Sequence, residues 1–309
     1  PSPRRSWAAA DAPAETEAFR RHRPSRMRPE GNGGRSRALR RSARIAAVTK
    51  LLVDRPYQTI TLTHLSELLG AAKSTLSEDI AIIRETFARL ELGRVETIAG
   101  AAGGVRYAPL LSGAQMRAVV GGLVEALSDP ERILPGGFLY VNDIVAAPQL
   151  LAQIGELFAT RFYDREPDVV VTVETRGIPI AMMTARALNV PLAIVRRSSR
   201  LGDGTVVTMN YVSGSAQRIE TMSLSRRAVP AGSRVLIIDD FMKAGGTARG
   251  LVDLMGEFDA EVAGIGVLIE TAAPEEKLVD DYTSLVVLEA VRERPREVVV
   301  RPSAWLAGV

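Results

Sequence analysis

The first regular spacing of apolar residues in the chain has the period of a helix. Within residues 45–52, apolar side chains recur at i, i+3, i+6 and i+7, and Pro56 closes the run. A second run, residues 62–69, follows a short β-branched stretch and ends at Gly70, a residue type that commonly terminates helices. The pattern therefore predicts two short helices before residue 70.

A third apolar stripe, residues 76–87, starts only a few residues later. Ser74 or Thr75 is a candidate N-cap, and Glu78 lies three residues after Thr75, as in a capping box. Two short helices joined by such a tight turn predict a helix-turn-helix.

Two strand-like runs follow, residues 94–98 and 105–107, and they flank a glycine-bearing turn. This hairpin predicts the wing of a winged helix. Residues 111–127 then have the pattern of a linking helix, and the turn at residues 135–137 begins a new unit.

From Phe138 onward, strand-like apolar runs alternate with helical stretches. The runs are residues 169–173, 192–195, 235–238 and 262–269. Near-continuous apolar strands separated by helices predict a parallel sheet covered on both faces. In such sheets, ligands bind where strands end and turns begin.

The net charge of +3 conceals an asymmetry along the chain. Residues 1–55 contain 14 Lys and Arg against 5 Asp and Glu, which suggests that this end meets a polyanion. Large apolar side chains are rare at the beginning of the chain, so that segment cannot bury enough surface to fold alone. A chain of 309 residues is also long enough for two folded units. We predict a disordered basic arm over 1–34, a winged helix over 35–110, a linking helix over 111–135 and an α/β domain over 136–309.

The absence of cysteine excludes disulfides, thiolate metal sites and cysteine nucleophiles. No apolar run reaches the roughly 18 residues that span a bilayer, and the N-terminus lacks the apolar stretch of a signal peptide. We therefore expect a cytoplasmic protein with no membrane partner, no catalytic constellation of the hydrolase type and no metal site of its own.

The most specific signal for a binding site follows the predicted strand 235–238. There Asp239 and Asp240 precede the turn 244–247 and a helix. Backbone N–H groups of this turn, at the positive end of the helix, can wrap a phosphate dianion, with the Thr247 hydroxyl as a further donor. Carboxylates at a strand tip can accept hydrogen bonds from vicinal ribose hydroxyls and help hold a hydrated Mg²⁺. The segment predicts a sugar-phosphate site.

The segment 235–247 resembles the phosphoribosyl pyrophosphate signature of type I phosphoribosyltransferases. Upstream, the loop 174–179 after strand 169–173 is similar to that family's loop for the pyrophosphate group. Arg196, Arg197 and Arg200 lie between the two motifs, in the region that matches the family's mobile flap. The resemblance implies an effector site at residues Asp239, Asp240, Phe241, Lys243, Ala244, Gly245, Gly246, Thr247, Thr175, Arg176 and Gly177.

Catalytic purine transferases of the hypoxanthine class place an acid four positions after the first carboxylate of the signature and a hydroxyl residue next. Here those positions hold Lys243 and Ala244. A lysine, with an ordinary pKa of about 10.4, stays cationic at neutral pH and cannot shuttle the proton. The substitution favours a sensor over an enzyme. Because other transferase classes lack this acid, an active purine phosphoribosyltransferase stays as an alternative.

A winged helix followed by a transferase-like domain is similar to the purine operon repressor of Gram-positive bacteria. The resemblance is carried by the segments 101–105, 129–137, 210–215 and 239–247. It implies a homodimer in which phosphoribosyl pyrophosphate, together with Mg²⁺, lowers the affinity for operator DNA upstream of purine biosynthesis genes. It also implies guanosine polyphosphate alarmones as candidate competitors for the pocket.

Three aromatic residues and one arginine complete this resemblance. Phe138 and Phe241 are candidates to stack on a purine ring, and Tyr211 is carried over from the family segment that contains it. Arg176 stands where the family usually has lysine, which keeps the charge and changes the donor geometry.

In a helix-turn-helix, the N-terminal part of the second helix enters the major groove. That part presents Lys73, Ser74, Thr75 and Ser77. Candidate phosphate contacts are Arg40, Arg41 and Arg44 at the start of the first helix and Arg106 on the wing. A second alternative is a DNA-binding protein whose transferase-like domain serves only dimerisation, and the Asp239–Asp240 pair argues against it.

Overall fold

The computed structural model describes residues 39–100, 103–198, 204–213 and 218–309. The predicted basic arm lies outside these residues, as do the wing tip at 101–102 and Arg200. In the described part, no helix is both long enough and apolar enough to cross a membrane.

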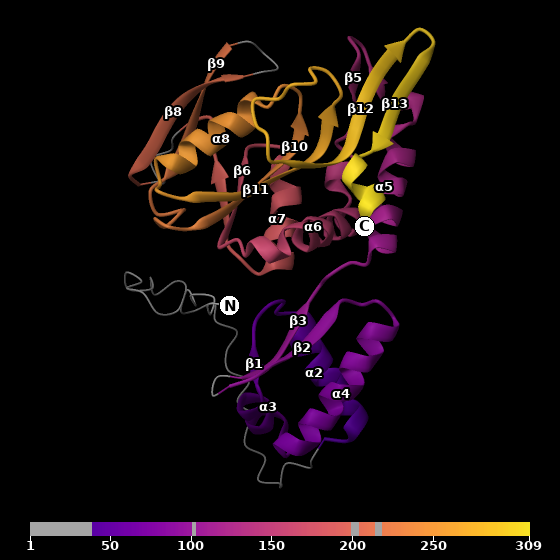
Figure 1. The fold of residues 1–309 in the computed structure, drawn as a ribbon, viewed down its shortest axis with the longest axis vertical. Coiled ribbons are helices and arrows are strands. Elements are labelled where there is room, and N and C mark those ends of the chain that lie inside the picture. Colours follow the sequence, from indigo (N-terminus) through magenta and orange to yellow (C-terminus); the bar gives the residue numbers. More distant parts are fainter. Residues whose placement is uncertain (1–38, 101–102, 199–203, 214–217) are drawn as a thin grey trace. The chain divides into compact units, whose positions relative to one another are not determined.

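The N-terminal part is a three-stranded antiparallel sheet, in the order β1-β3-β2, packed against three helices (Figure 1). Its elements are α2 (Arg41–Val53), β1 (Ile60–Thr61), α3 (Leu62–Leu69), α4 (Lys73–Arg89), β2 (Arg94–Ile98) and β3 (Gly104–Ala108). The apolar stripes of the three helices meet in one core, in which Leu52, Leu65 and Leu76 are fully buried. The predicted winged helix-turn-helix is confirmed.

The turn between α3 and α4 differs from the prediction at one end. Gly70 ends α3 with φ of 64°, as predicted, and Thr61 caps its start by accepting from the His64 N–H. The N-cap of α4 is Ala72, which has no side-chain cap, so the prediction of Ser74 or Thr75 as the cap was wrong. The backbone N–H of Leu76 already bonds to the Ala72 carbonyl, which places both hydroxyl residues inside the first turn.

The C-terminal part is built on a six-stranded sheet in the order β13-β12-β11-β10-β6-β7 (Figure 1). The strands are β6 (Val169–Val173), β7 (Leu192–Val195), β10 (Arg234–Met242), β11 (Glu261–Thr271), β12 (Thr283–Glu293) and β13 (Arg296–Pro302). All neighbours pair in parallel except β12 and β13. Together with the winged helix, this sheet confirms the predicted fold class.

Helices cover both faces of this sheet, as the near-continuous apolar strands predict. The helices are α5 (Gly113–Leu127), α6 (Pro148–Phe162), α7 (Gly177–Leu188) and α8 (Gly246–Gly256), with short 3-10 turns η1 (Pro130–Arg132), η2 (Ile144–Ala146), η3 (Tyr163–Arg165) and η5 (Ala304–Gly308). On β10, Leu236 and Ile238 pack into the core shared with α5, α6 and α7, while Val235 and Ile237 pack against α8. Alternate side chains of one strand thus face two separate cores.

Two small hairpins stand apart from the main sheet. They are β4 (Ile133–Leu134) with β5 (Phe138–Leu139), and β8 (Val206–Ser213) with β9 (Arg218–Ser225). The second hairpin lies in the region that resembles a flap. It is fixed to the end of β7, because the Arg196 and Ser223 backbones bond to each other in both directions.

Candidate functional site

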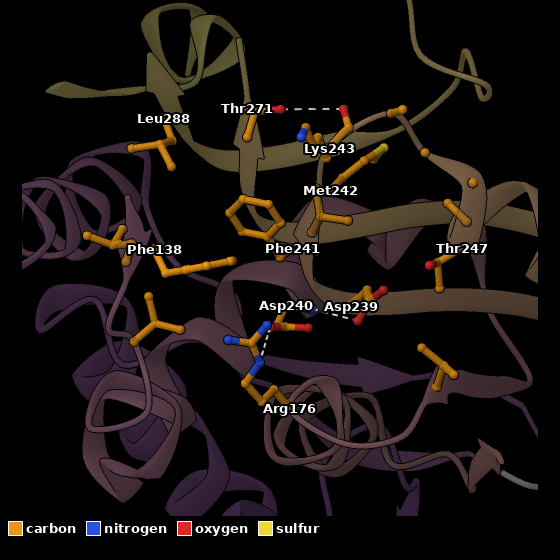
Figure 2. A pocket seen from close by; sticks show the side chains of 18 of the residues that line it. Phe138, Arg176, Asp239, Asp240, Phe241, Met242, Lys243, Thr247, Thr271 and Leu288 are labelled. Atoms are coloured by element: carbon orange, nitrogen blue, oxygen red, sulfur yellow. Dashed lines mark hydrogen bonds and ion pairs between the residues drawn. The ribbon is translucent and has the colours of Figure 1, made fainter. Parts of the chain in front are cut away.

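Both motifs singled out in the sequence line one cavity of about 960 Å³ at the carboxyl ends of β6, β10 and β11 (Figure 2). The predicted effector residues on its wall are Phe138, Thr175, Arg176, Asp239, Asp240, Phe241, Lys243, Ala244, Gly245, Gly246 and Thr247. Gly177 and Tyr211, the other two predicted effector residues, are not among the lining residues. Ligands bind at this edge of a parallel sheet because strand ends and helix N-termini converge there.

Asp239 is a buried carboxyl at the floor of the cavity, with only 7% of the residue exposed. It accepts the backbone N–H of Asp240 at 2.8 Å. Burial, and secondly the neighbouring charge of Asp240, raise its pKa well above the ordinary value. Asp239 lies within β10, opposite Val267 of β11, so the prediction that the strand ends at residue 238 was wrong.

Gly177 supports Asp239 from behind. A Cβ at this position would lie 2.5 Å from the Thr172 hydroxyl and 2.9 Å from Asp239 Oδ1. No side chain fits there without displacing the carboxyl. Gly177 therefore lets the start of α7 approach β10, and it shapes the site without lining it.

Asp240 and Arg176 are in contact on one side of the cavity (Figure 2). Arg176 Nε lies 3.0 Å from Asp240 Oδ2, as an ion pair. The same Oδ2 atom is buried and has no hydrogen-bond partner among the described residues. Arg176 is thus the partner of this oxygen in the described residues, and because the arginine is half exposed, a donor from a ligand can share or replace the pair.

The glycine turn forms the wall beside these carboxylates. Gly245 takes a left-handed φ of 82° and is the N-cap of α8, so the backbone N–H groups that begin this helix open toward the cavity. The Leu278 N–H bonds to the Ala244 carbonyl at 2.9 Å and fixes the turn from outside. Lys243 extends on the Thr271 side, away from Arg176 (Figure 2). The turn lies beside the carboxylates, and its binding of phosphate stays a prediction.

The opposite wall of the cavity is apolar. Phe138, which is 70% exposed, and Phe241 lie on it together with Leu288 and Val291 of β12. Glu293, at the end of β12, accepts the backbone N–H groups of both glycines before Phe138, at 2.8 and 2.9 Å. These contacts were not predicted from the sequence, because they join residues more than 150 positions apart.

The buried carboxyl predicts a measurable effect of pH on stability. Between the ordinary pKa of an aspartate and its raised value, folded Asp239 retains a proton that the unfolded chain has lost, so stability falls as pH rises above about 4. Asp239→Asn is expected to remove this fall. At pH 8 it should be more stable than the parent by on the order of 1 kcal/mol, or about 2–4 °C in Tm.

Thermal unfolding from pH 4.5 to 8.5 checks this expectation. Asp253→Asn is the matched control, because Asp253 lies on the exposed side of α8 in a pair with Arg249. Parallel Tm curves for Asp239→Asn and the parent would show that Asp239 ionises normally.

The predicted DNA contacts differ in their exposure on the winged helix. Lys73, Ser74 and Ser77 are exposed on α4, Arg40 is exposed before α2, and Thr75 is half-buried. Arg44 instead reaches into the domain: its side chain is 12% exposed and its Nε lies 2.8 Å from Asp79, which is fully buried on α4. Arg41 pairs with the same carboxylate at 3.3 Å.

Arg106 also has a partner inside its domain. Its Nε donates to Glu96 on the neighbouring strand at 2.8 Å, and its side chain is 22% exposed. Arg44 and Arg106 are therefore held in part-buried ion pairs that brace the domain, a position that differs from the expected exposed phosphate contacts. Sequence alone does not distinguish an exposed arginine from one that pairs within the fold.

One cation on α4 was missed by the sequence analysis. Arg84 lies on a groove of about 230 Å³ between α4 and the sheet, together with Ser77, Ala81 and Thr97. Ser77, Ala81 and Arg84 share one helix face, at i, i+4 and i+7. Within the described chain Arg84 has no ion-pair partner. The helical spacing could have found it, because the same face carries Lys73.

Comparison with known proteins identifies the two domains. The family model "Bacterial purine repressor, N-terminal" matches residues 40–109, and the model "Phosphoribosyl transferase domain" matches residues 141–300. The Bacillus subtilis purine biosynthesis transcriptional repressor PurR is 47% identical over 268 residues, which are 87% of this chain and 94% of that protein. The chain belongs to the PurR family. This confirms the resemblance to purine operon repressors.

Two further relatives are a second PurR protein and a phosphoribosyltransferase enzyme. The Lactococcus lactis purine biosynthesis transcriptional activator PurR is 38% identical over 263 residues, covering 85% of this chain and 97% of that protein. Xanthine phosphoribosyltransferase of Deinococcus deserti is 34% identical over 154 residues, covering 48% of this chain and 80% of the enzyme. The match to the enzyme thus covers about half of this chain, whereas the PurR matches extend over most of it.

Proposed function

We propose that this protein is a DNA-binding repressor of purine biosynthesis genes, and that phosphoribosyl pyrophosphate bound in the α/β cavity relieves DNA binding. The observation that supports the effector site is the cavity itself, in which two carboxylates, one of them paired with Arg176, lie beside the glycine turn that begins α8. Ribose hydroxyls can donate to these carboxylates, and a phosphate fits the backbone N–H groups of the turn. Such a regulator acts where promoter DNA is, in the cytoplasm.

The pyrophosphate group is expected beside Arg176. Its guanidinium is half exposed and lies between the pyrophosphate-type loop and Asp240, so it can turn to an anion that enters the cavity. A Mg²⁺ ion would use the two carboxylates and take its other ligands from effector oxygens and water, because the described residues contain no group of three or more side chains that holds a metal.

A sensor role is supported by the residues at the position of the transferase acid. Lys243 occupies it, with Ala244 at the following hydroxyl position, and Lys243 extends toward Thr271 and away from the carboxylate pair (Figure 2). Nothing else on the turn offers a carboxylate to a base. The alternative function is that of an active purine phosphoribosyltransferase. The similarity to xanthine phosphoribosyltransferase supports this alternative.

One experiment separates these possibilities. Fluorescence anisotropy of a purine-gene promoter fragment is measured at fixed salt, with and without phosphoribosyl pyrophosphate and Mg²⁺. Tight binding that the effector relieves supports the repressor, and binding that the effector strengthens indicates an activator. Absence of promoter binding, with turnover of the effector in the presence of a nucleobase, would replace the repressor by the enzyme.

The apolar wall favours a second ligand for the same cavity. Phe138 presents an exposed ring on the wall that also carries Phe241, across the cavity from the phosphate turn. A purine ring on this wall would place its phosphates at the glycine turn, so guanosine polyphosphate alarmones are proposed as competitors of phosphoribosyl pyrophosphate. Competition in the same anisotropy assay tests this, and Phe138→Ala should weaken the alarmone more than the effector.

A homodimer is also proposed, because operator recognition by a winged helix commonly uses two half-sites related by protein symmetry. Sedimentation of the full chain at several concentrations, with and without promoter DNA, tests it.

The face of α4 that carries Lys73 and Arg84 is proposed as the DNA contact. Replacing both by alanine should weaken binding to operator and to unrelated DNA alike, because phosphate contacts carry no sequence information. The slope of log affinity against log salt should fall by about 2 units, on the rule of about 0.9 per phosphate. Anisotropy at 50–200 mM salt measures it.

Arg89→Ala is the control for this face. Arg89 lies on the same helix five residues after Arg84, about 140° around the axis, and is exposed. Its loss should leave the slope unchanged. An unchanged slope in the Lys73→Ala and Arg84→Ala double variant would remove this face from the interface.

A further inference from the structure

The turn before Phe138 is held by a side chain from a distant part of the sequence. Gly136 and Gly137 come directly before Phe138, and their backbone N–H groups both donate to Glu293 Oε1, at 2.8 and 2.9 Å. Glu293 is exposed and is the last residue of β12. Successive N–H groups that converge on one oxygen form a small anion-binding concavity. Here the anion is a carboxylate of the protein itself.

The glycine turn is weakly constrained by its own residues. Gly136 has φ of 87° and Gly137 has φ of 72°, and glycine adopts positive values about as readily as negative ones, so both residues lose much conformational freedom when the turn forms. Within the turn, the Gly137 N–H also bonds to the Leu134 carbonyl, at the longer distance of 3.2 Å. The flanking strands β4 and β5 form only two residue pairs. Glu293 restrains both glycines through one oxygen and thereby selects one conformation of the turn.

The position of the Phe138 ring depends on this conformation. The residue is largely exposed, so few packing contacts hold it. A Cβ at Gly136 would lie 3.3 Å from the ring, which shows that the ring lies against the turn itself. Phe138 nevertheless lines the cavity, on the apolar wall to which β12 contributes Leu288 and Val291. A change in the turn therefore moves the ring relative to this wall.

The hairpin of β12 and β13 also holds the other end of the segment before Phe138. Arg296, at the start of β13, donates through Nη2 to the carbonyls of Pro130 and Ile133, at 2.9 and 3.2 Å. On β12, Val291 and Glu293 lie two positions apart and so share one face of the strand, with Val291 in the cavity wall and Glu293 at the turn. One hairpin therefore forms part of the wall and fixes the neighbouring segment at both ends.

We propose that Glu293 is a positioning residue that increases the affinity of the cavity for ligands that carry a purine base. It holds the glycine turn before a ligand arrives, so the Phe138 ring is in place to stack on the base and little freedom is lost on binding. A sugar phosphate without a base does not use the ring. Glu293 therefore contributes to the affinity for a purine nucleotide and not to that for phosphoribosyl pyrophosphate. This inference rests on the proposed binding of purine nucleotides at the apolar wall and adds the residue that prepares the wall.

Calorimetry of the full-length protein with two ligands tests this role. Guanosine tetraphosphate carries a base, whereas phosphoribosyl pyrophosphate, added with Mg²⁺, does not. Glu293→Ala should weaken binding of the first ligand about threefold to tenfold, the effect of one net hydrogen bond, and leave binding of the second unchanged. In the Phe138→Ala background the same change should have no further effect, because the ring that Glu293 positions is gone. Glu293→Gln keeps an acceptor oxygen and should cause a smaller loss.

Glu289→Ala is the matched control. Glu289 is another exposed glutamate of β12, paired with Arg301 on β13 at 2.8 Å, so its loss should leave both affinities unchanged. Three results for Glu293→Ala would each overturn the proposal: equal losses for both ligands, an undiminished affinity for guanosine tetraphosphate, or a loss that persists in the Phe138→Ala background. A purely structural role depends on neither the base nor the ring.

The parent protein distinguishes this failure from that of the proposed function. A parent that binds phosphoribosyl pyrophosphate but not guanosine tetraphosphate would overturn the purine site on the apolar wall, and the role of Glu293 with it. A parent that binds neither ligand would overturn the effector site as well.

Discussion

Replacing Asp239 and Asp240 by asparagine is expected to abolish the response to phosphoribosyl pyrophosphate and to leave promoter affinity in its absence unchanged. Each carboxylate offers a charged hydrogen bond to the ribose, worth about 1.5–3 kcal/mol, and the amides keep the shape of the site. The effector concentration for half-release of DNA should rise by at least ~100-fold. Promoter anisotropy titrated with the effector measures this concentration.

Asp253→Asn is the control for this pair. It makes the same chemical change on α8, at an exposed ion pair outside the cavity, and should respond like the parent. The separation of the two effects follows from linkage, because an effector changes DNA affinity only by preferring one conformation of the protein. An undiminished response in the double variant would place the effector site elsewhere.

Asp79→Ala is expected to cause the largest loss of stability in the winged helix. Asp79 is fully buried, and its Oδ2 forms an ion pair with Arg44 Nε at 2.8 Å. Arg41 pairs with the same carboxylate. Removing it leaves Arg44 nearly buried without this counter-charge, which costs about 3–5 kcal/mol. Promoter binding should fall with the folded fraction of residues 40–109, and hydrogen exchange of their amides measures the local stability.

Two further variants make this result specific. Asp54→Ala removes an exposed i,i+4 pair with Lys50 and should cost no more than about 0.5 kcal/mol. Combining Arg44→Met with Asp79→Leu should recover most of the lost stability, because a well-packed apolar pair can replace a buried ion pair. A single Asp79→Ala variant as stable as the parent would show that the pair is not a brace.

The sequence by itself determined the order and type of the main elements. The helical spacing of residues 45–87, the hairpin at 94–107 and the apolar strands from 169 onward depend on neighbours a few positions apart, and the structure has each of them. The phosphate turn could be predicted for the same reason: a strand, two carboxylates, glycines and a helix follow one another in the chain.

Only the tertiary structure decided which charged side chains are exposed and which form ion pairs within the fold. Asp79 and Arg44 have the sequence context of exposed helix residues and instead form a part-buried pair across two helices. Tyr211 was expected in the cavity and instead packs against α8, where a Cβ at Gly250 would come within 3.0 Å of its side chain. Glu293 joins the site from the far end of the chain. Such contacts depend on how distant segments pack, and no local pattern of residues records them.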